Sequence, residues 1–344
     1  MEVFEVGPCE DGHELGVLIG KRFAAEIRSR IAKDLILQKQ LLPFARSPDS
    51  RSLLSCLSET NIERYPAYWD ELRGLAVGSG SPFLEIMLLN FRKEIIPFIS
   101  KDNENTNDDC SDVLVVSDSM AFAAHNEDAN VALLGHTYLI KAVLSNGTSF
   151  TAYTYAGELP SCAFGFNSHG MAFTLNSVPP LKHEIEAGAV GRNFVSRDLL
   201  EAQNIDDAVS RICSSRVSVG HGYNLIDTKT RRILNLETAS RGRFSIFEVG
   251  DAPFFHANAY LHLKVDQEED ENSMRRHKRA ITLLENGSSF VAILGDKNDA
   301  KHPIYMTGPL LYTLCTVAID LDRKMMCIYH GNPLETQPSN VFLL

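Results

Sequence analysis

The residue best suited to covalent chemistry is Cys110, because it stands where a polar segment meets an apolar one. Residues 100–109, SKDNENTNDD, contain no apolar side chain, whereas residues 113–116, VLVV, form an apolar run typical of a buried strand. A solvated linker before the cysteine and a rigid strand after it predict that the Asp109–Cys110 bond is accessible and well positioned. The alternative is an inert thiol, since a free cysteine usually packs as a small apolar side chain.

Five acidic residues surround Cys110, and they oppose the formation of a thiolate there. Acidic neighbours raise the pKa of a thiol, so a nucleophilic Cys110 needs a base from another source. One source is its own amine. If the preceding bond were cut, Cys110 would carry an α-amine with a pKa of about 7.7–8.0, a serviceable general base at neutral pH. The acids are Asp102, Glu104, Asp108, Asp109 and Asp112.

A second group of candidate residues is the run His125-Asn126-Glu127-Asp128, which follows Cys110 after two apolar stretches and a turn. A hairpin between these stretches would bring Asp128 back beside Cys110. Three of the four side chains are also metal-ligand types. Adjacent residues of a strand point to opposite faces, however, and no third ligand is apparent, so we expect no metal. A solvated loop is the alternative for the whole run.

Asparagines at the ends of expected strands and turns form a third group. Asparagine is disfavoured in strands, so its presence there needs a reason. A side-chain amide that faces a pocket can donate a hydrogen bond to an oxyanion, a contribution of about 3 kcal/mol. The alternative is a turn asparagine that bonds its own backbone, and for any single one this is the better interpretation. The residues are Asn167, Asn176, Asn224 and Asn258.

The elements that position these residues are expected to be helices up to residue 99 and mostly strands after residue 110. Apolar residues recur every four positions from Leu15 to Leu35, which predicts one long amphipathic helix over 12–42. Later helices are expected at 193–203, 205–214 and 273–285. Hairpins, in place of strand–helix alternation, predict an α+β domain with mostly antiparallel sheets. Strands are expected at 112–117, 121–126, 137–144, 149–155, 164–167, 170–178, 222–227, 232–237, 243–248, 254–258, 312–319 and 325–330.

The composition restricts the class of protein. The 33 basic and 44 acidic residues give a net charge of −11, with no basic cluster, so nucleic acid and membrane surfaces are not expected as partners. The N-terminus lacks the pattern of a signal peptide, and no apolar run approaches the length of a membrane span, so the expected compartment is the cytoplasm. Seven scattered cysteines without a C-x-x-C pair favour neither a disulfide framework nor zinc.

Several motifs, taken in order, resemble the penicillin acyltransferase family of N-terminal-nucleophile (Ntn) hydrolases. The likeness spans nearly the whole chain, and the order and spacing of the motifs are more specific than any one of them. They are Gly12-His13-x-x-Gly16-x-x-x-Gly20, Asn90-Phe-Arg-Lys-Glu94, Cys110-Ser111, His125-Asn126-Glu127-Asp128, Gly165-Phe-Asn167-x-x-Gly170 leading to Asn176, Asn235-Leu-Glu237, and His256-Ala-Asn258 followed by Arg276-His277-x-Arg279.

The resemblance implies a single αββα domain over residues 1–344, a sandwich of two mostly antiparallel sheets flanked by helices. It also implies an inactive precursor that cuts itself between Asp109 and Cys110. The products would be a small helical subunit of residues 1–109, which includes the linker 100–109, and a catalytic subunit of residues 110–344. These two subunits of one chain are the only protein partners expected.

The resemblance also implies roles for individual residues. Cys110 would be the nucleophile and its amine the base, while Asp128 would orient the amine or the thiol. Asn258 would donate to the oxyanion, with Asn176 as a plausible second donor. Asn126 and Glu127, which flank these positions, would support the site.

Two positions depart from the family pattern. Asp109 stands where the family usually has glycine, and Leu310 stands where the acyltransferase site has arginine. The preferred reading is therefore a cysteine amidohydrolase that cleaves a small N-acyl amine or amino-acid conjugate through a Cys110 thioester. An N-acyltransferase with acyl-CoA as co-substrate is the alternative, and no other cofactor is expected. A non-enzymatic scaffold, in which Asp109 blocks maturation, is the third reading.

Overall fold

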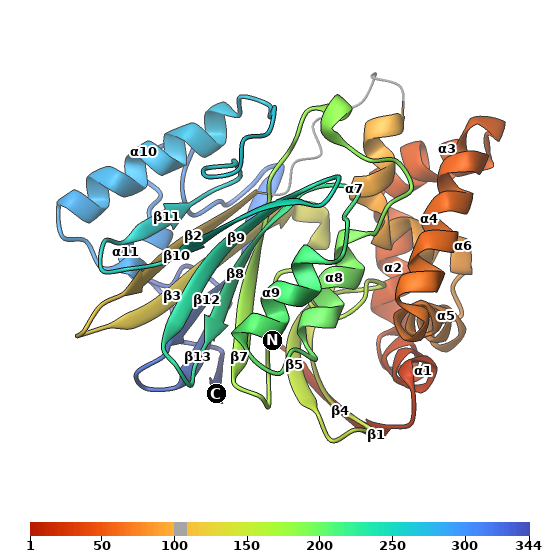
Figure 1. Ribbon diagram of the computed structural model, residues 1–344, viewed down its shortest axis with the longest axis horizontal. Helices are drawn as coiled ribbons and strands as arrows, with labels where there is room; N and C mark the ends of the chain where they lie inside the picture. The colour runs from red at the N-terminus through yellow and green to blue at the C-terminus, as the bar shows by residue number, and fades with distance from the viewer. Residues whose placement is uncertain (100–108) are drawn as a thin grey trace.

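Two β-sheets lie face to face at the centre of this computed structural model, which describes residues 1–99 and 109–344 (Figure 1). Within these residues the first sheet has eight strands and the second has six. The first sheet runs in the order β1 (Val3–Cys9), β4 (Thr137–Leu144), β5 (Ser149–Tyr155), β6 (Phe164–Asn167), β7 (Met171–Ser177), β8 (His221–Asp227), β9 (Arg232–Ala239) and β10 (Arg243–Glu248). The second runs β11 (Phe254–His256), β2 (Asp109–Val116), β3 (Ala121–Asn130), β12 (Leu311–Asp320), β13 (Met325–Tyr329) and β14 (Asn340–Leu343).

Helices cover the outer face of each sheet, so the predicted αββα order of layers is confirmed (Figure 1). One buried apolar cluster joins the first sheet to its helices, a second fills the space between the sheets, and a third joins the second sheet to its helices. The first sheet is covered by α1 (Gly12–Arg22), α2 (Ala24–Lys33), α3 (Leu42–Arg46), α4 (Arg51–Arg64), α5 (Pro66–Ser79), α6 (Phe83–Asn90), α7 (Arg92–Ile95), α8 (Arg192–Leu199) and α9 (Ile205–Cys213), and the second by α10 (Glu271–Glu285) and α11 (Phe290–Leu294).

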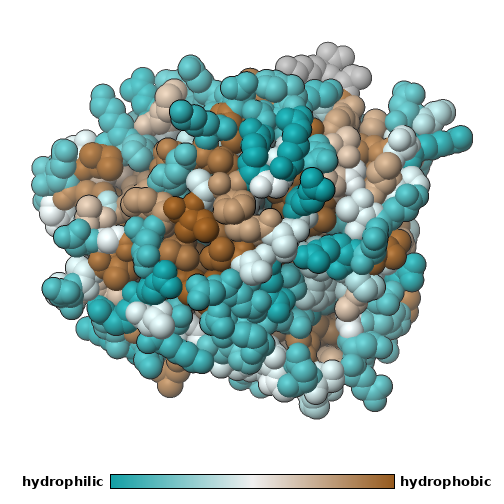
Figure 2. Space-filling model, viewed as in Figure 1, coloured by the Kyte–Doolittle hydropathy of each residue, from teal (hydrophilic) through white to brown (hydrophobic). Residues whose placement is uncertain are grey.

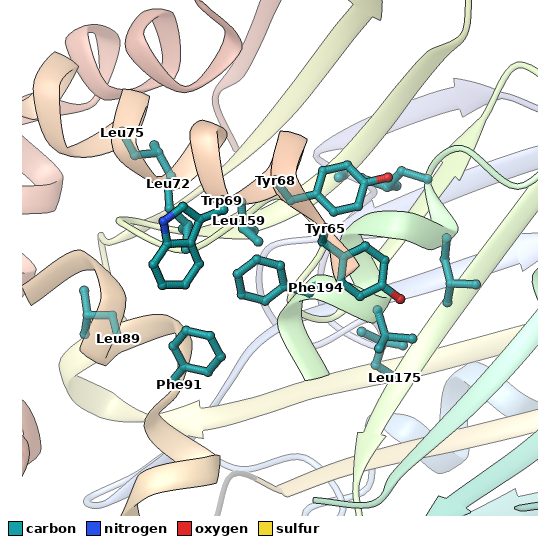
Figure 3. Packing of buried hydrophobic residues seen from close by; sticks show 14 of the residues in the cluster. Tyr65, Tyr68, Trp69, Leu72, Leu75, Leu89, Phe91, Leu159, Leu175 and Phe194 are labelled. Carbon is teal, nitrogen blue, oxygen red and sulfur yellow. The ribbon is translucent and has the colours of Figure 1, made fainter. Parts of the chain in front are cut away.

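Aromatic side chains join helices that are far apart in the sequence (Figure 3). Trp69 of α5 stacks on Phe194 of α8 with their ring centroids 6.2 Å apart, and Phe194 stacks on Phe91 at 5.4 Å. Large aromatic rings bury more apolar area than other side chains and dominate core energetics. The helices before the linker and those after it therefore share one core.

Close contact between α1 and α5 explains the glycine motif near the start of the chain. A Cβ atom on Gly16 would lie 2.0 Å from the carbonyl oxygen of Glu71, and one on Gly20 would lie 2.6 Å from that of Leu75. Real side chains do not approach a backbone so closely, so only glycine fits at this contact. The contact also fixes Glu71 beneath the first sheet.

The long helix predicted over residues 12–42 is wrong, because the chain leaves the helical conformation at Phe23 and again at Asp34. The Asp34 carboxylate accepts the backbone N–H of Leu37 at 2.9 Å, and Leu37 opens the next short helical segment. A short acidic side chain that bonds the backbone in this way competes with continuation of a helix. The apolar periodicity therefore continues along this segment, although the helical conformation is interrupted.

The part of the chain before the linker is not wholly helical as expected, because β1 joins the edge of the first sheet. Residues 3–6 pair in parallel with residues 139–142 of β4. A single short strand has no neighbour in sequence to pair with, so no hairpin pattern announces it. As a result, residues 1–99 contribute to both the sheet and the helical layer.

Strand β2 begins three residues earlier than predicted, so the Asp109–Cys110 bond lies inside a strand. Asp109 and Cys110 pair with Asp128 and Glu127 of β3. Their exposed fractions are 3% and 4%. The expectation of an accessible bond in a solvated linker is therefore wrong; the linker residues 100–108 themselves lie outside the described residues.

Exposed apolar side chains gather over one face of the molecule (Figure 2). Strand β10 is an edge of the first sheet, and its Phe244, Ile246 and Phe247 remain 46%, 45% and 38% exposed. Phe247 also stacks on His262 at 4.9 Å between ring centroids. Phe247, which lies on the opposite face of β10 from Phe244 and Ile246, therefore borders the loop after β11, which contains Asn258.

Candidate active site

The hairpin of β2 and β3 sorts the candidate residues onto two faces of the second sheet. Side chains alternate along a strand, and residues directly opposite each other on neighbouring strands share a face. Register places Cys110 opposite Glu127 and Asp109 opposite Asp128. The face toward the first sheet carries Cys110, Asp112, His125 and Glu127, and the face toward α10 and α11 carries Asp109, Ser111, Asn126 and Asp128.

The sulfur of Cys110 faces a buried carboxylate and an imidazole. Cys110 Sγ donates to Glu127 Oε2 at 3.6 Å, and His125 Nε2 lies 3.1 Å from the same oxygen. The relevant atoms of these three side chains all lie within 4.8 Å of one another. Tyr155 of β5 donates its hydroxyl hydrogen to the other oxygen of Glu127. Glu127 is thus a hydrogen-bonded carboxylate in contact with the thiol.

His125 is held between two carboxylates. Its Nδ1 lies 3.0 Å from Asp112 Oδ1, an oxygen that also accepts the hydroxyl of Thr174 at 2.7 Å. Burial alone would lower the pKa of His125, but the charge of Asp112 and hydrogen bonds with Asp112, Cys110 and Glu127 raise it well above its usual range. The two carboxylates therefore favour the protonated imidazole, whose positive charge offsets the negative charge of Glu127.

In the uncut chain, the thiol of Cys110 is protonated at neutral pH. Burial raises the pKa of Cys110 to about 12, with a further increase from the charge of Glu127, although His125 acts in the opposite direction. This agrees with the sequence argument that acids around Cys110 oppose a thiolate. A proton must therefore be removed from the sulfur before or during any attack.

We expect Cys110 in the uncut chain to resist alkylation, because the thiolate is the reacting species. Iodoacetamide at pH 8 should label Cys56, which is exposed, within minutes and leave Cys110 unlabelled. The measurement is peptide mass mapping of the whole-chain band from a denaturing gel. Labelling of both cysteines at equal rates would contradict the burial of the thiol, and labelling after unfolding in urea provides the positive control.

On the other face of the hairpin, Arg276 of α10 reaches the backbone of Cys110. Its Nη1 donates to the Cys110 carbonyl oxygen at 2.6 Å and to Ser111 Oγ at 2.8 Å, while Nη2 donates to Asn258 Oδ1 at 2.8 Å. Nη2 also lies 3.5 Å from Asp109 Oδ1. Arg276 is fully buried, so these interactions are not screened by water.

Asn258 holds the nitrogen of Cys110. Its Oδ1 accepts the Cys110 backbone N–H at 2.9 Å, and its Nδ2 donates to the carbonyl oxygen of Ser177 at 2.9 Å. The amide oxygen, and not the amide nitrogen, therefore faces Cys110. Its predicted role as an oxyanion donor would require a different orientation of the amide.

Asn176 has a donor that is not engaged. It is fully buried, and its Nδ2 makes no hydrogen bond with any of the described residues. On β7, the Thr174 hydroxyl donates to Asp112. The carbonyl oxygen of Ser177 accepts a hydrogen bond from Asn258, which in turn accepts one from the backbone N–H of Cys110. Asn176 shares a face of β7 with Thr174, because side chains alternate along a strand, so it faces the second sheet.

Asp128 is the buried carboxyl group opposite Asp109. Thr313 of β12 donates to its Oδ1, and its Oδ2 accepts no hydrogen bond from the part of the chain that the structure describes. Burial raises the pKa of Asp128 to about 7; Arg276 and Thr313 lower it, and the charges of Asp109 and Glu127 raise it further. The side chain is on the opposite face of the hairpin from the sulfur, so any contact with Cys110 is through the backbone nitrogen.

Asp128 is expected to make the whole chain less stable as pH rises from about 4 to 7. In the folded chain its pKa is about 7, whereas an unfolded aspartate has about 3.9, so folding takes up a proton between these values. Asp128→Asn should flatten this part of the stability curve, as measured by urea denaturation at pH 5 and pH 8 in the Cys110→Ala background, which is expected to remain one chain. Asp118→Asn, an exposed site in the β2–β3 turn, should leave the curve unchanged.

The other candidate asparagines make hydrogen bonds that join elements of the fold. Asn126 Nδ2 donates to the carbonyl oxygens of Leu294 and Ile304, so it joins β3 to α11 and the loop after it. Asn167 donates to the carbonyl oxygens of Leu200 and Ala202. Asn224 donates to Thr174 and accepts from Asn235, and so supports the side chains behind Asp112.

Sequence reasoning gave no role to Arg276, although the motif that contains it was noticed. The signal was available in the helical spacing: Ser273, Arg276 and Ala280 fall on one side of α10 and are its buried residues. An arginine on the inward face of a helix must find acceptors there, since buried charges are paired. Tyr155 and Asn272, which also touch the site, gave no such signal.

No helix in residues 1–99 and 109–344 is long and apolar enough to cross a membrane.

Residues 115–335 match the profile of the family described as "Acyl-coenzyme A:6-aminopenicillanic acid acyl-transferase". This match begins after Cys110 and includes Asp128, Asn176, Asn258 and Arg276.

Similar proteins include the β-alanyl-dopamine/carcinine hydrolase of Drosophila melanogaster, which is 24% identical over an alignment 359 positions long that covers 95% of this chain and 92% of the relative. Two solved structures are also similar. The N-acylethanolamine-hydrolyzing acid amidase ortholog of Caenorhabditis elegans has a TM-score of 0.43 and 13% identity, and the match covers 68% of this chain and 100% of that one. Penicillin V acylase from Agrobacterium tumefaciens has a TM-score of 0.37 and 11% identity over 68% and 84% of the two chains.

The match to the family profile covers more than half of the chain, and the αββα fold carries the family's motifs in their order. The chain therefore belongs to the acyl-coenzyme A:6-aminopenicillanic acid acyl-transferase family, the penicillin acyltransferase family of Ntn hydrolases.

Proposed function

We propose that the chain is an amide hydrolase that matures by cutting itself between Asp109 and Cys110, with Cys110 as its nucleophile. The observation that carries the proposal is that the sulfur and the nitrogen of one buried cysteine are held separately, the sulfur by Glu127 and the nitrogen by Asn258. Transfer of an acyl group from that nitrogen to that sulfur requires both atoms to be held. Family membership and the hydrolase name of the Drosophila relative support the same reaction class.

In the uncut chain Cys110 has no free amine, so another group must take the proton from its sulfur. Glu127 is in position to do so, at 3.6 Å, and the cationic His125 beside it stabilises the charged carboxylate that accepts. When the sulfur attacks the carbonyl carbon of Asp109, the C–S bond forms and the C–N bond breaks. The proton that left the sulfur ends on the Cys110 nitrogen, and water then hydrolyses the thioester to a carboxyl group and a thiol.

After the cut, the α-amine of Cys110 takes over as the base, since its ordinary pKa is about 7.7–8.0. We assign Asn258 Oδ1 to hold this amine, because it already accepts the same nitrogen. Asp128 Oδ2 is assigned to hold the amine from the other side. The unengaged Nδ2 of Asn176 is assigned to the oxyanion, where removal of a donor commonly costs about 10²–10³-fold in rate.

Hydrolysis is proposed in preference to acyl transfer because the position that carries arginine in the acyltransferase site is occupied by Leu310, which is 71% exposed and offers no charge. The substrate class is a small N-acyl amine or amino-acid conjugate. The amine leaves first, and water then resolves the acyl group from Cys110.

The proposal is tested by following the purified full chain with intact mass spectrometry. The wild type should yield the fragments 1–109 and 110–344, the second with a new N-terminal cysteine, while Cys110→Ala stays whole. Hydroxylamine, which cleaves thioesters, should accelerate the appearance of the fragments. A wild type that stays whole and hydrolyses no amide would overturn the proposal. Addition of acyl-CoA and an amine would show whether the thioester is also passed to a nitrogen nucleophile.

A further inference from the structure

The side chain of Asp109 is bound by α10 in the uncut chain. Asn272 Nδ2 donates to Asp109 Oδ2 at 2.5 Å, and Arg276 Nη2 lies 3.5 Å from Asp109 Oδ1. Asp109 is 3% exposed and Arg276 is fully buried. A carboxylate in so dry a place is stable only with a cation and a hydrogen-bond donor, and α10 supplies both.

The residue before the nucleophile is also the first acyl group that the nucleophile receives. In the self-cleavage proposed above, the carbonyl carbon of Asp109 moves from the Cys110 nitrogen to the Cys110 sulfur. During turnover the same sulfur carries the acyl group of the substrate. The two thioesters differ only in the acyl substituent, so groups that hold the Asp109 side chain lie where the far end of a substrate acyl group must go.

From these contacts we propose that Asn272 and Arg276 form an acyl subsite for a carboxylate, and that the enzyme prefers amides of dicarboxylic acids of succinyl type. This proposal rests on the proposed function. In Asp109 the carboxylate carbon is separated from the carbonyl carbon by two carbons, the same spacing as in a succinyl group. Once the bond is cut, Asp109 must leave the subsite before the substrate enters it.

The positive charge of the subsite makes a succinyl group a better fit than a β-alanyl group, the acyl group in the name of the Drosophila relative. A β-alanyl group places an ammonium at the same spacing from its carbonyl carbon at which a succinyl group places a carboxylate. Arg276 is a fixed cation, and like charges within about 4 Å repel one another strongly where water is excluded. Burial raises the pKa of the nearby Asp128, so its carboxyl group offsets the cation of Arg276 less than an ordinary carboxylate would.

Three conjugates of one chromogenic amine test the proposal with the self-cleaved wild-type enzyme: N-succinyl, N-butyryl and N-β-alanyl. They have nearly the same length and differ in the charge at the end of the acyl group. We expect kcat/KM for the succinyl conjugate to exceed that for the butyryl conjugate by about tenfold, the effect of one charge-assisted hydrogen bond, and to exceed that for the β-alanyl conjugate by more. Asn272→Leu should bring the succinyl-to-butyryl ratio toward one, while Asn286→Leu, at the exposed far end of α10, should leave it at the wild-type value.

Preference for the butyryl or the β-alanyl conjugate by an enzyme that has cut itself would overturn the carboxylate subsite and leave the proposed function standing. If the cut enzyme hydrolyses none of the three, protection of Cys110 from iodoacetamide decides. Succinate should then protect better than butyrate or β-alanine at equal concentration, and equal protection would overturn the subsite. A chain that neither cuts itself nor hydrolyses an amide contradicts the proposed function instead.

Discussion

Replacement of Arg276 by methionine is expected to stop self-cleavage and to lower the free energy of unfolding by about 3–5 kcal/mol. The guanidinium group donates to the Cys110 carbonyl oxygen and to Asn258 Oδ1, and it lies beside the carboxylate of Asp109. Methionine would remove a donor and a positive charge from these buried acceptors, although the Cys110 N–H still donates to Asn258 Oδ1 and Asn272 still donates to Asp109. The two residues that flank the proposed cut would also lose a group that holds them. Cleavage is measured by intact mass over time, and stability by urea denaturation of Arg276→Met and its parent in the Cys110→Ala background, which is expected to remain one chain.

Two further variants separate the loss of fold from the loss of reaction. Arg276→Lys keeps the charge but not the planar fork of donors, so it should fold and cut itself more slowly than the wild type. Arg275→Met removes the neighbouring arginine, whose partner Glu271 is exposed, and should cut itself at the wild-type rate. Normal cleavage in Arg276→Met would mean that the guanidinium only packs α10 against β2.

The second large effect is expected at Arg197, which is buried between the helices before and after the linker. Its Nε donates to both carboxylate oxygens of Glu71, at 3.3 and 3.0 Å, and its guanidinium lies over the rings of Tyr68 and Phe150. Arg197→Met would leave Glu71 unpaired, which commonly costs about 3–5 kcal/mol. The change is measured by urea denaturation in the Cys110→Ala background, which is expected to remain one chain.

The loss in Arg197→Met should be larger at pH 8 than at pH 5. Burial raises the pKa of Glu71 to about 7 even with Arg197 present, and without Arg197 the pKa would rise further. At pH 5 the Glu71 carboxyl group of the variant is then neutral and costs less to bury. At pH 8 the folded variant must either bury an unpaired Glu71 carboxylate or take up a proton from water, and both cost free energy. The double variant Glu71→Leu, Arg197→Met should recover most of the stability. Arg73→Met, which breaks an exposed pair with Asp70, should change it by less than about 1 kcal/mol.

Much of the fold could be predicted from the sequence, because strand hairpins and amphipathic helices follow local patterns. The limits were set by non-local pairing. β1 was missed since its partner, β4, lies more than a hundred residues away. The start of β2 was misplaced because Asp109 was assigned to a solvated linker and the strand was expected only from residue 112. Polar side chains continue a strand where the neighbouring strand and a helix such as α10 supply their partners.

The candidate site could be predicted in part. Cys110, Asp128, Asn176 and Asn258 lie around one hairpin, while the roles that the resemblance implied for them stay predictions. The orientation of a side-chain amide cannot be deduced from residue type, so the sequence could not show that Asn258 presents its oxygen to Cys110. The role of Arg276 also depends on a contact across 166 positions of sequence, which no local pattern records.

Several buried contacts tie residues 1–99 to residues 109–344, and they bear on what a cut chain can do. Arg30 bonds Glu158 at 2.5 Å, Arg197 bonds Glu71, and β1 is an edge strand on β4. Each part by itself lacks the partners of its buried charges. We therefore expect the complete fold to form while the chain is continuous. Once the bond is broken, unfolding would release two pieces that must find each other at their bulk concentration. A self-cleaved protein that has been denatured is therefore not expected to refold, because its two pieces would first have to reassociate.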